Sequence, residues 1–236
     1  MLSVTVLSGG LDSTTLAYQL YKNEYEQLFL SFNYGQKHSK ELEKAAITAK
    51  KLKGEHHIIS LPFGDLLTSA VTTKDRKVPE GHYAAENMSQ TVVPNRNAIM
   101  LSIAWGVACS RQARVVSCGI HAGDFAVYPD CRQYFIDKLN SALLAATEGL
   151  YPKHSMLHIN TPYVNISKAA ILKLGLGWNV PYEDTWTCYV GGEKACGTCG
   201  ACVERLSSFA LNNAEDPLEY EDRETWKEYM KEHEGV

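Results

Sequence analysis

Near its start the chain reads Leu7-Ser8-Gly9-Gly10-Leu11-Asp12-Ser13-Thr14. The apolar residues 2–7 come before this run and predict a buried parallel strand, because short continuous apolar runs are typical of strands covered on both faces. After it, apolar residues recur at helical spacing as far as Leu20. Two glycines let the backbone turn sharply and approach an anion, and a helix start offers free N–H groups. The pattern therefore predicts a phosphate-binding turn between a strand and a helix.

This turn differs from the two commoner phosphate loops. It lacks the Gly-Lys-Ser/Thr of a Walker loop and the three spaced glycines of a dinucleotide fingerprint. It resembles the loop of the N-type ATP pyrophosphatases, which bind ATP, adenylate a carboxylate or amide oxygen and release pyrophosphate. The hydroxyls of Ser8, Ser13 and Thr14 add donors, and Asp12 is a candidate ligand for Mg²⁺, which prefers carboxylate oxygen. The alternative is a glycine-rich turn without a ligand.

Length and charge narrow the class of protein. A chain of 236 residues is long enough for one large α/β domain with an appendage. The net charge of −4 gives no broad footprint for nucleic acid, so no direct nucleic-acid partner is expected. No apolar run is long enough to span a bilayer, and the apolar start is too short for a signal peptide. We therefore expect a cytoplasmic protein whose seven cysteines are reduced.

Strand and helix patterns alternate along the chain. Strands are expected at 28–32, 57–61, 114–120 and 157–161, and helices at 37–52, 95–110, 132–148 and from about 168. Residues 63–76 are expected to form a short helix followed by a polar stretch, and residues 77–90 a loop or lid. Such alternation predicts an α/β fold with a Rossmann-like parallel sheet and helices on both faces.

The expected sheet also indicates where a ligand binds. Ligands of such sheets lie at the carboxyl ends of the strands, near the point where strand order reverses. This rule brings the loop at 8–13 together with residues 33–38, 93–97 and 119–124. Arg96, near a helix start, is a candidate phosphate ligand or else part of a structural ion pair. Asp124 and Asp130 are candidate ligands or caps of helices and turns.

A second group of residues lies near the C-terminus. Four cysteines fall in one short stretch, with two-residue gaps between the last three: Cys188, Cys196, Cys199 and Cys202. Four thiolates suit one tetrahedral Zn²⁺ per chain, and an iron–sulfur cluster is the competing interpretation. Cys109, Cys118 and Cys131 are expected to be small buried hydrophobes. We therefore expect two parts, an ATP-pyrophosphatase-type domain over residues 1–180 and a zinc-binding C-terminal lobe over residues 181–236.

Together these motifs resemble one family, 7-cyano-7-deazaguanine synthase of the queuosine pathway. The resemblance runs from the loop at 8–13 to residues 216–220, nearly the whole chain. The segments that carry it, besides the loop, are Tyr34-Gly35-Gln36, residues 93–97, Tyr128-Pro129-Asp130-Cys131-Arg132, residues 185–189 and the cysteine cluster with Glu204-Arg205. One segment departs from the family: many members read Asn-Ala-Val-Asp-Tyr-Ser-Gly where this chain reads His121-Ala122-Gly123-Asp124-Phe125-Ala126-Val127.

The resemblance implies a fold like that of the adenine nucleotide α-hydrolases, a homodimer, and the substrates 7-carboxy-7-deazaguanine, ammonia and ATP, with Mg²⁺ and Zn²⁺. ATP adenylates the carboxylate and ammonia gives the amide; a second adenylation and elimination then give the nitrile, preQ0. It implies nucleotide binding by residues 7–14 with Tyr34, Gln36 and Arg96; catalysis by Asp12, Ser13, Arg96 and Lys168; and base binding by His121, Asp124, Tyr128, Asp130 and Arg132. For Lys168 the alternative is a solvated side chain.

Three alternatives stay open at this point. A tRNA-thiolating enzyme shares the ATP loop, although it needs a reactive cysteine or cluster and a basic surface. A zinc-ribbon adaptor needs no ATP loop, so the N-terminal half argues against it. A variant of the synthase stops at the amide. The sequence also leaves open whether the product serves tRNA or DNA modification.

Overall fold

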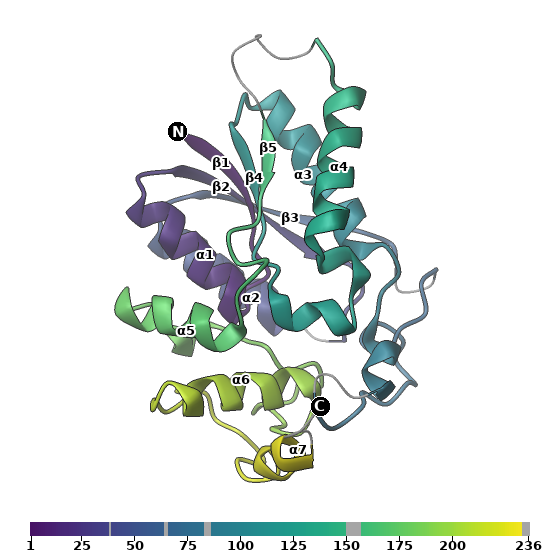
Figure 1. The fold of residues 1–236 in the computed structure, drawn as a ribbon, viewed down its shortest axis with the longest axis vertical. Helices are drawn as coiled ribbons and strands as arrows, with labels where there is room; N and C mark the ends of the chain where they lie inside the picture. The colour runs from purple at the N-terminus through teal and green to yellow at the C-terminus, as the bar shows by residue number, and fades with distance from the viewer. Residues whose placement is uncertain (38, 64–65, 83–85, 150–156, 233–236) are drawn as a thin grey trace.

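Five parallel strands form one sheet at the centre of the molecule (Figure 1). The computed structural model describes residues 1–37, 39–63, 66–82, 86–149 and 157–232. The strands are β1 (Leu2–Val6), β2 (Glu26–Asn33), β3 (Glu55–Ser60), β4 (Val115–Ser117) and β5 (His158–Asn160), in the order β3-β2-β1-β4-β5. Strand order therefore reverses at β1, and the loops after β1 and β4 leave the sheet side by side.

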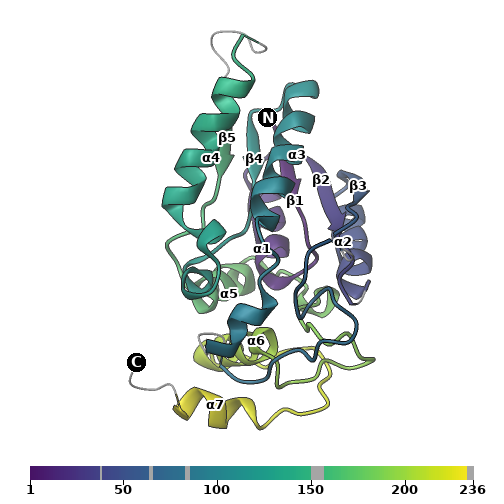
Figure 2. The same cartoon turned by 90° about the vertical axis from the view of Figure 1, so that its right-hand side faces the viewer.

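Helices cover both faces of the sheet, as the alternation of patterns predicts. They are α1 (Leu11–Lys22), α2 (Lys40–Lys51), α3 (Arg96–Ser110), α4 (Gln133–Ala146), α5 (Lys168–Gly177), α6 (Gly200–Leu211) and α7 (Trp226–Glu232). Short 3₁₀ turns are η1 (Glu86–Thr91), η2 (Ala122–Ala126), η3 (Pro129–Cys131) and η4 (Tyr182–Asp184). Figure 2 shows α3 and α4 in front of the sheet. None of the described helices combines the length and hydropathy needed to cross a membrane.

Side chains that alternate along the strands form a separate hydrophobic core on each face of the sheet. Val4, Leu28 and Leu30 join α3 in the largest buried cluster, whereas Phe29, one residue out of phase, packs with Ala45 of α2 on the other face. Successive side chains of a strand point to opposite faces, so a sheet covered on both sides buries both sets. The polar side chains among them are hydrogen-bonded, as Ser3 Oγ is to Ser117 Oγ at 2.9 Å. The buried parallel sheet predicted from the sequence is confirmed.

The C-terminal part forms a lower layer beneath α1 and α5, drawn green to yellow in Figure 1. Tyr182 and Phe209 of this part share a buried cluster with Leu16 of α1. Inside the layer, Arg205 of α6 and Asp216 are both fully buried and form an ion pair at 2.7 Å. The division at residue 180 stays a prediction, because this apolar cluster runs across it.

The helix predicted within residues 63–76 is wrong for the described part, which forms turns. Serine and threonine side chains there bond to nearby backbone: the Ser69 N–H donates to Thr73 Oγ1 at 3.3 Å, and Thr72 Oγ1 donates to the Leu67 carbonyl at 3.2 Å. Such local bonds compete with helical ones. Within residues 77–82, Glu80 pairs with Cys199 of the cysteine lobe in an isolated bridge. Residues 83–85 of the predicted lid lie outside the described residues.

Candidate active site

A cleft of about 210 Å³ opens where strand order reverses, at the carboxyl ends of β1 and β4. Segments far apart in the sequence meet there: a Cβ added at Gly119, after β4, would lie 3.2 Å from the Asp12 backbone. Of the residues predicted to bind ligands, those that line the cleft are Leu7, Ser8, Gly10, Asp12, Ser13, Tyr34, Gln36, Arg96, His121, Asp124, Tyr128 and Lys168. Residues from all four segments that the strand-end rule grouped line this cleft.

The loop between β1 and α1 is held by its own serines. Ser8 Oγ and Ser13 Oγ lie 2.9 Å apart, and the Gly10 N–H donates to Ser8 Oγ at 3.2 Å. Gly9 has φ +86°, and a Cβ there would lie 2.0 Å from the Glu41 carbonyl oxygen, so only glycine fits. The start of α1 is thereby presented to the cleft with its free N–H groups, an arrangement that suits an anion.

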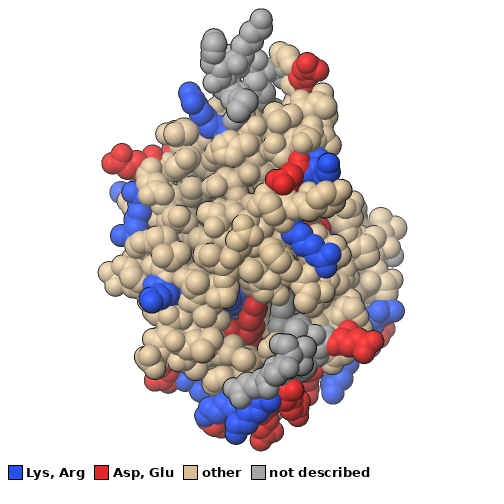
Figure 3. Space-filling view, viewed as in Figure 1, with Lys and Arg blue, Asp and Glu red and all other residues tan. Residues whose placement is uncertain are grey.

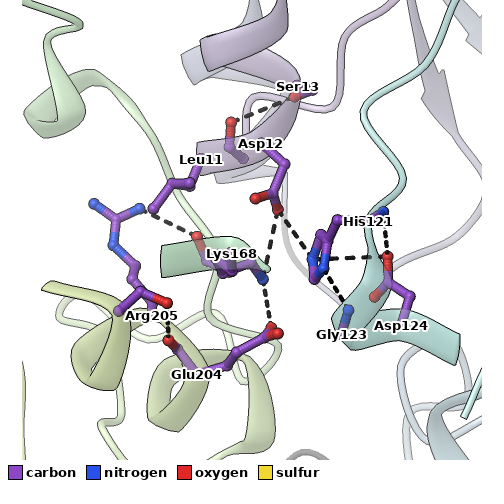
Figure 4. Close-up of polar contacts among 12 residues, drawn as sticks. Leu11, Asp12, Ser13, His121, Gly123, Asp124, Lys168, Glu204 and Arg205 are labelled. Atoms are coloured by element: carbon purple, nitrogen blue, oxygen red, sulfur yellow. Dashed lines mark hydrogen bonds and ion pairs between the residues drawn. The ribbon is translucent and has the colours of Figure 1, made fainter. Parts of the chain in front are cut away.

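A chain of charges crosses the cleft from Asp12 to α6 (Figure 4). Lys168 Nζ lies 3.5 Å from Asp12 Oδ2 and 2.5 Å from Glu204 Oε2. Burial lowers the pKa of Lys168, but the neighbouring Asp12 and Glu204 carboxylates outweigh it and raise that pKa above its usual range. Lys168 is therefore a fixed cation and not a solvated side chain. The other Asp12 oxygen, Oδ1, is buried and has no hydrogen-bond partner among the described residues.

His121 joins the same network from the loop after β4. Its Nδ1 accepts a hydrogen bond from the Gly123 N–H at 3.1 Å, so the ring proton of the neutral imidazole lies on Nε2. Nε2 lies 3.7 Å from both Asp12 Oδ2 and Asp124 Oδ2. A Cβ at Gly123 would lie 2.5 Å from Glu204 Oε1, which explains a glycine beside this histidine. The ring therefore presents an N–H donor toward the two carboxylates.

Asp124 has both of the roles considered from the sequence. Its Oδ2 accepts the His121 backbone N–H at 3.4 Å and caps η2, and the same side chain lines the cleft. Asp130 acts as a cap: its Oδ2 accepts the Asn97 N–H at 3.1 Å at the start of α3. A cap and a ligand are therefore compatible for Asp124.

Arg96 and Tyr34 form the opposite wall. Arg96 Nη1 donates to Tyr34 Oη at 3.2 Å, and the guanidinium lies 5.4 Å from the centre of the Tyr34 ring. Gln36 shapes the turn beneath them, because its side chain accepts from the Tyr34 N–H at 2.9 Å and donates to the Phe32 carbonyl at 3.2 Å. Arg96 makes no ion pair with a carboxylate among the described residues, which leaves its charge available to an anion.

Some predicted residues lie outside the cleft as the structure describes it: Gly9, Leu11, Thr14, Asp130 and Arg132. Leu11 is fully buried in the core beneath α1. Arg132 is exposed and its Nη2 donates to the Phe125 carbonyl at 2.7 Å, so it fixes the loop after β4. Thr14 Oγ1 is buried without a partner among the described residues.

Two acidic residues of the site were missed. Glu204 was predicted only as part of the family motif that follows Cys202, with no role of its own. Its contact with Lys168 depends on how α6 packs on α5. Glu41 lines the cleft from the first turn of α2, a segment whose Lys, Glu and Ala content is typical of a solvated helix. Its position directly after a strand-end loop was the available signal.

The four C-terminal cysteines form a compact cluster. All four Sγ atoms lie within 4.8 Å of one another, and those of Cys196 and Cys202 are 3.9 Å apart. Tetrahedral ligation at about 2.3 Å requires sulfur separations of roughly 3.8 Å, so the geometry fits one ion. The Cys196 N–H donates to Cys188 Sγ, and the Cys199 N–H to Cys196 Sγ, each at 3.3 Å. Backbone donors of this kind stabilise thiolates, so this cluster could hold a metal ion.

The fold and the cleft define a class: α/β proteins that bind a nucleotide on a glycine-rich loop after the first strand of a parallel sheet. The chain belongs to the family described as "Queuosine biosynthesis protein QueC", whose sequence model matches residues 2–213. The family resemblance found in the sequence is thereby confirmed.

Two curated relatives similar to this chain bear the same name. A "7-cyano-7-deazaguanine synthase" from Caldicellulosiruptor saccharolyticus is 47% identical over 227 residues, which are 96% of this chain and 98% of that protein. One from Sinorhizobium fredii is 49% identical over 228 residues, 96% of this chain and 94% of that protein. Among solved structures, an NMN synthetase from Francisella tularensis has a TM-score of 0.47 and 15% identity, covering 90% of this chain and 77% of that one.

Proposed function

We propose that the chain converts 7-carboxy-7-deazaguanine, ammonia and ATP into 7-cyano-7-deazaguanine. The carrying observation is one cleft that joins a phosphate loop to Lys168, in a chain 47% identical to a synthase over 96% of its length. A carboxylate is a poor electrophile until one oxygen becomes part of a leaving group. Adenylation supplies that leaving group, ammonia displaces AMP to give the amide, and a second adenylation with elimination gives the nitrile.

The phosphates of ATP bind on the loop at 8–13 and the start of α1. Ser13 is placed there to donate to a phosphate oxygen, and Lys168 brings the fixed positive charge described above. Arg96 lines the same cleft as the loop, and it forms no ion pair with a carboxylate among the described residues. These groups hold the pyrophosphate still and stabilise the charge that develops on it, so the site acts through positioning and electrostatics.

The charge balance of the network supports Mg²⁺. Asp12, Asp124 and Glu204 bring three carboxylates close to one lysine, an excess of negative charge where a polyphosphate binds. The Asp12 Oδ1 atom, buried and without a partner in the described residues, is the oxygen that would hold the ion. Mg²⁺ held there would neutralise phosphate charge and polarise the phosphate that is attacked.

The base binds beside the loop after β4, where a polar edge meets an apolar wall. The wall is formed by Phe32, Met100, Cys118, Ile120 and Tyr128. Asp124 accepts hydrogen bonds from the guanine-like N–H groups of the base, and the His121 Nε2–H, which faces the Asp12 and Asp124 carboxylates, orients them. Burial raises the pKa of Cys118 to about 11, so this side chain is a neutral thiol against the base.

The cysteine cluster holds zinc as a structural ion. A zinc ion with four thiolate ligands has no open coordination position for substrate, which is typical of structural zinc. Residues 77–90 are the candidate lid that keeps water from the acyl adenylate, and Glu80 among them pairs with Cys199 of this lobe. The cytoplasmic location and the homodimer stay predictions, the second testable by light scattering on the purified protein.

Product analysis tests the function directly. The purified chain is incubated with 7-carboxy-7-deazaguanine, ATP, Mg²⁺ and ammonia, and the products are separated by mass. The nitrile is expected, with AMP and pyrophosphate. Accumulation of the amide alone would identify a variant that stops half-way. The proposal would be refuted if neither product formed and if 7-carboxy-7-deazaguanine did not stimulate ATP–pyrophosphate exchange. A brown protein containing iron would identify a cluster in place of zinc.

A further inference from the structure

Glu41 occupies a position in the cleft that the roles above leave unused. It belongs to the first turn of α2, and its backbone carbonyl packs against Gly9 of the phosphate loop. The side chain is partly buried and lines the same cleft as Asp12 and Arg96. Because Glu41 and the phosphate loop line one cleft, a ligand bound on that loop shares the cleft with this carboxylate.

The Glu41 carboxylate has no hydrogen bond or ion pair within the part of the chain that the structure describes. The titratable groups that act on it come from three other segments: Arg96 of α3, Tyr34 after β2 and Cys188 of the cysteine loop. Burial raises the pKa of Glu41 to about 8, with Arg96 opposing and Cys188 adding to the rise. A carboxyl group of this kind gains and loses its proton near neutral pH, which suits a general base.

We propose that the Glu41 carboxylate accepts the proton released when ammonia attacks the acyl adenylate. The inference rests on the proposed function and adds a catalytic residue to it. The ammonia lone pair forms the C–N bond, and the C–O bond to AMP breaks with its electron pair leaving on AMP. The new nitrogen carries an extra proton, which passes to a Glu41 oxygen and leaves the neutral amide. Solvent takes that proton at the mouth of the cleft.

The second half of the reaction needs a base at the same place. The nitrogen of the adenylated amide carries two protons, and both must leave to give the nitrile. Solvent takes the first, which leaves a neutral imidate bonded to AMP. The C–O bond to AMP then breaks with its electron pair leaving on AMP, the nitrogen lone pair forms the third C–N bond, and Glu41, again ionised, accepts the last N–H proton. One carboxylate therefore serves both steps, because the same carbon and nitrogen react in each.

The experiment separates adenylation from the nitrogen steps. Glu41→Gln keeps the shape and removes the base, Glu41→Asp keeps a carboxylate, and Glu43→Gln is the matched control on the exposed side of α2. ATP–pyrophosphate exchange without ammonia measures adenylation, and mass analysis measures amide and nitrile. Hydroxylamine replaces ammonia in a pH series, because it is already unprotonated at neutral pH and its own titration does not overlap.

Glu41→Gln is expected to keep exchange and melting temperature while product formation falls by about a hundredfold or more. Glu41→Asp should recover part of that loss, and Glu43→Gln should match the wild type. With hydroxylamine the wild-type rate should rise through about pH 8, because only ionised Glu41 accepts a proton, and the rise should vanish in Glu41→Gln.

Product formation by Glu41→Gln within about threefold of the wild type would overturn the inference and leave the proposed function standing. Loss of exchange in Glu41→Gln would also overturn it, since the residue would then act in adenylation. A wild-type chain without exchange would refute the proposed function itself, and this inference with it.

Discussion

Lys168 Nζ and Glu204 Oε2 lie 2.5 Å apart, although they belong to α5 and α6 on opposite sides of the cysteine loop in the sequence. Glu204 follows the metal-site residue Cys202 by two positions on one helix. The cation of the phosphate site is therefore held by the lobe that the cysteines fold. Whatever loosens the cysteine cluster is expected to displace Lys168 as well.

Removing the charge of Glu204 should affect both stability and adenylation. Glu204→Gln removes the carboxylate 2.5 Å from the buried Lys168 and leaves the Asp12 carboxylate at 3.5 Å. Breaking a buried pair in this way costs about 3 kcal/mol in free energy of unfolding, measurable by urea titration. Glu219→Gln is the control, since Glu219 pairs with Lys194 at the exposed surface and should change stability little. Equal effects of the two substitutions would contradict the role given to Glu204.

Asp12→Asn should slow adenylation by about a hundredfold without unfolding the protein. The side chain lies on the phosphate turn, and its loss removes an electrostatic contact made mainly in the transition state, worth roughly 3 kcal/mol. ATP–pyrophosphate exchange measures the rate, and a melting curve checks the fold. Wild-type exchange in this variant would show that Asp12 serves only in the helix start.

Metal content tests the cysteine cluster. One zinc per chain is expected by elemental analysis, and Cys199→Ala should lose it, because this fully buried thiol is one of four ligands. A loss of about 3 kcal/mol lowers Tm by roughly 6–12 °C in a chain of this size. Cys109→Ala, in α3 and away from the cluster, is the matched control. Unchanged zinc in the Cys199 variant would sink the assignment.

Asp124 is expected to discriminate between the two organic ligands. Asp124→Ala should weaken binding of 7-carboxy-7-deazaguanine by about tenfold or more, since N–H groups of the base are left unpaired, and weaken ATP binding far less. Calorimetric titration of each ligand separates the effects. Because Asp124 also caps η2, the melting temperature should fall too, and Asp124→Asn should retain more stability than Ala. Equal weakening of both ligands would place this loop at the nucleotide.

The fold was predictable because each of its signals is local. An apolar run, two glycines and a helical repeat specify the strand, the turn and α1 without knowledge of the rest of the chain. The cysteine spacing is equally local, and the cluster is confirmed as a possible metal site. The failed helix within residues 63–76 has a local cause as well, in side-chain hydroxyls that bond to the backbone.

The missing parts of the site depend on tertiary packing. Nothing near Glu204 in the sequence indicates that it meets Lys168, 36 positions away, because the contact is created by α6 packing on α5. The same holds for Glu41. The composition of α2 is typical of a solvent-exposed helix, but in the fold the first turn of α2 packs against the phosphate loop. Residue types and strand-end positions in the sequence predict where a site lies. The burial and ion pairs of its side chains, which determine their charge states, are seen only in the folded structure.

The backbone hydrogen bond from the Trp186 N–H to the Gly9 carbonyl, 2.9 Å long, joins the start of the chain to a segment made much later. During synthesis the glycine loop leaves the ribosome first, and Trp186 and Glu204 follow after most of the polypeptide. The nascent chain therefore carries an unfinished nucleotide site until its last helices emerge. A chain that ends before residue 186 therefore lacks both this bond and the Glu204 partner of Lys168.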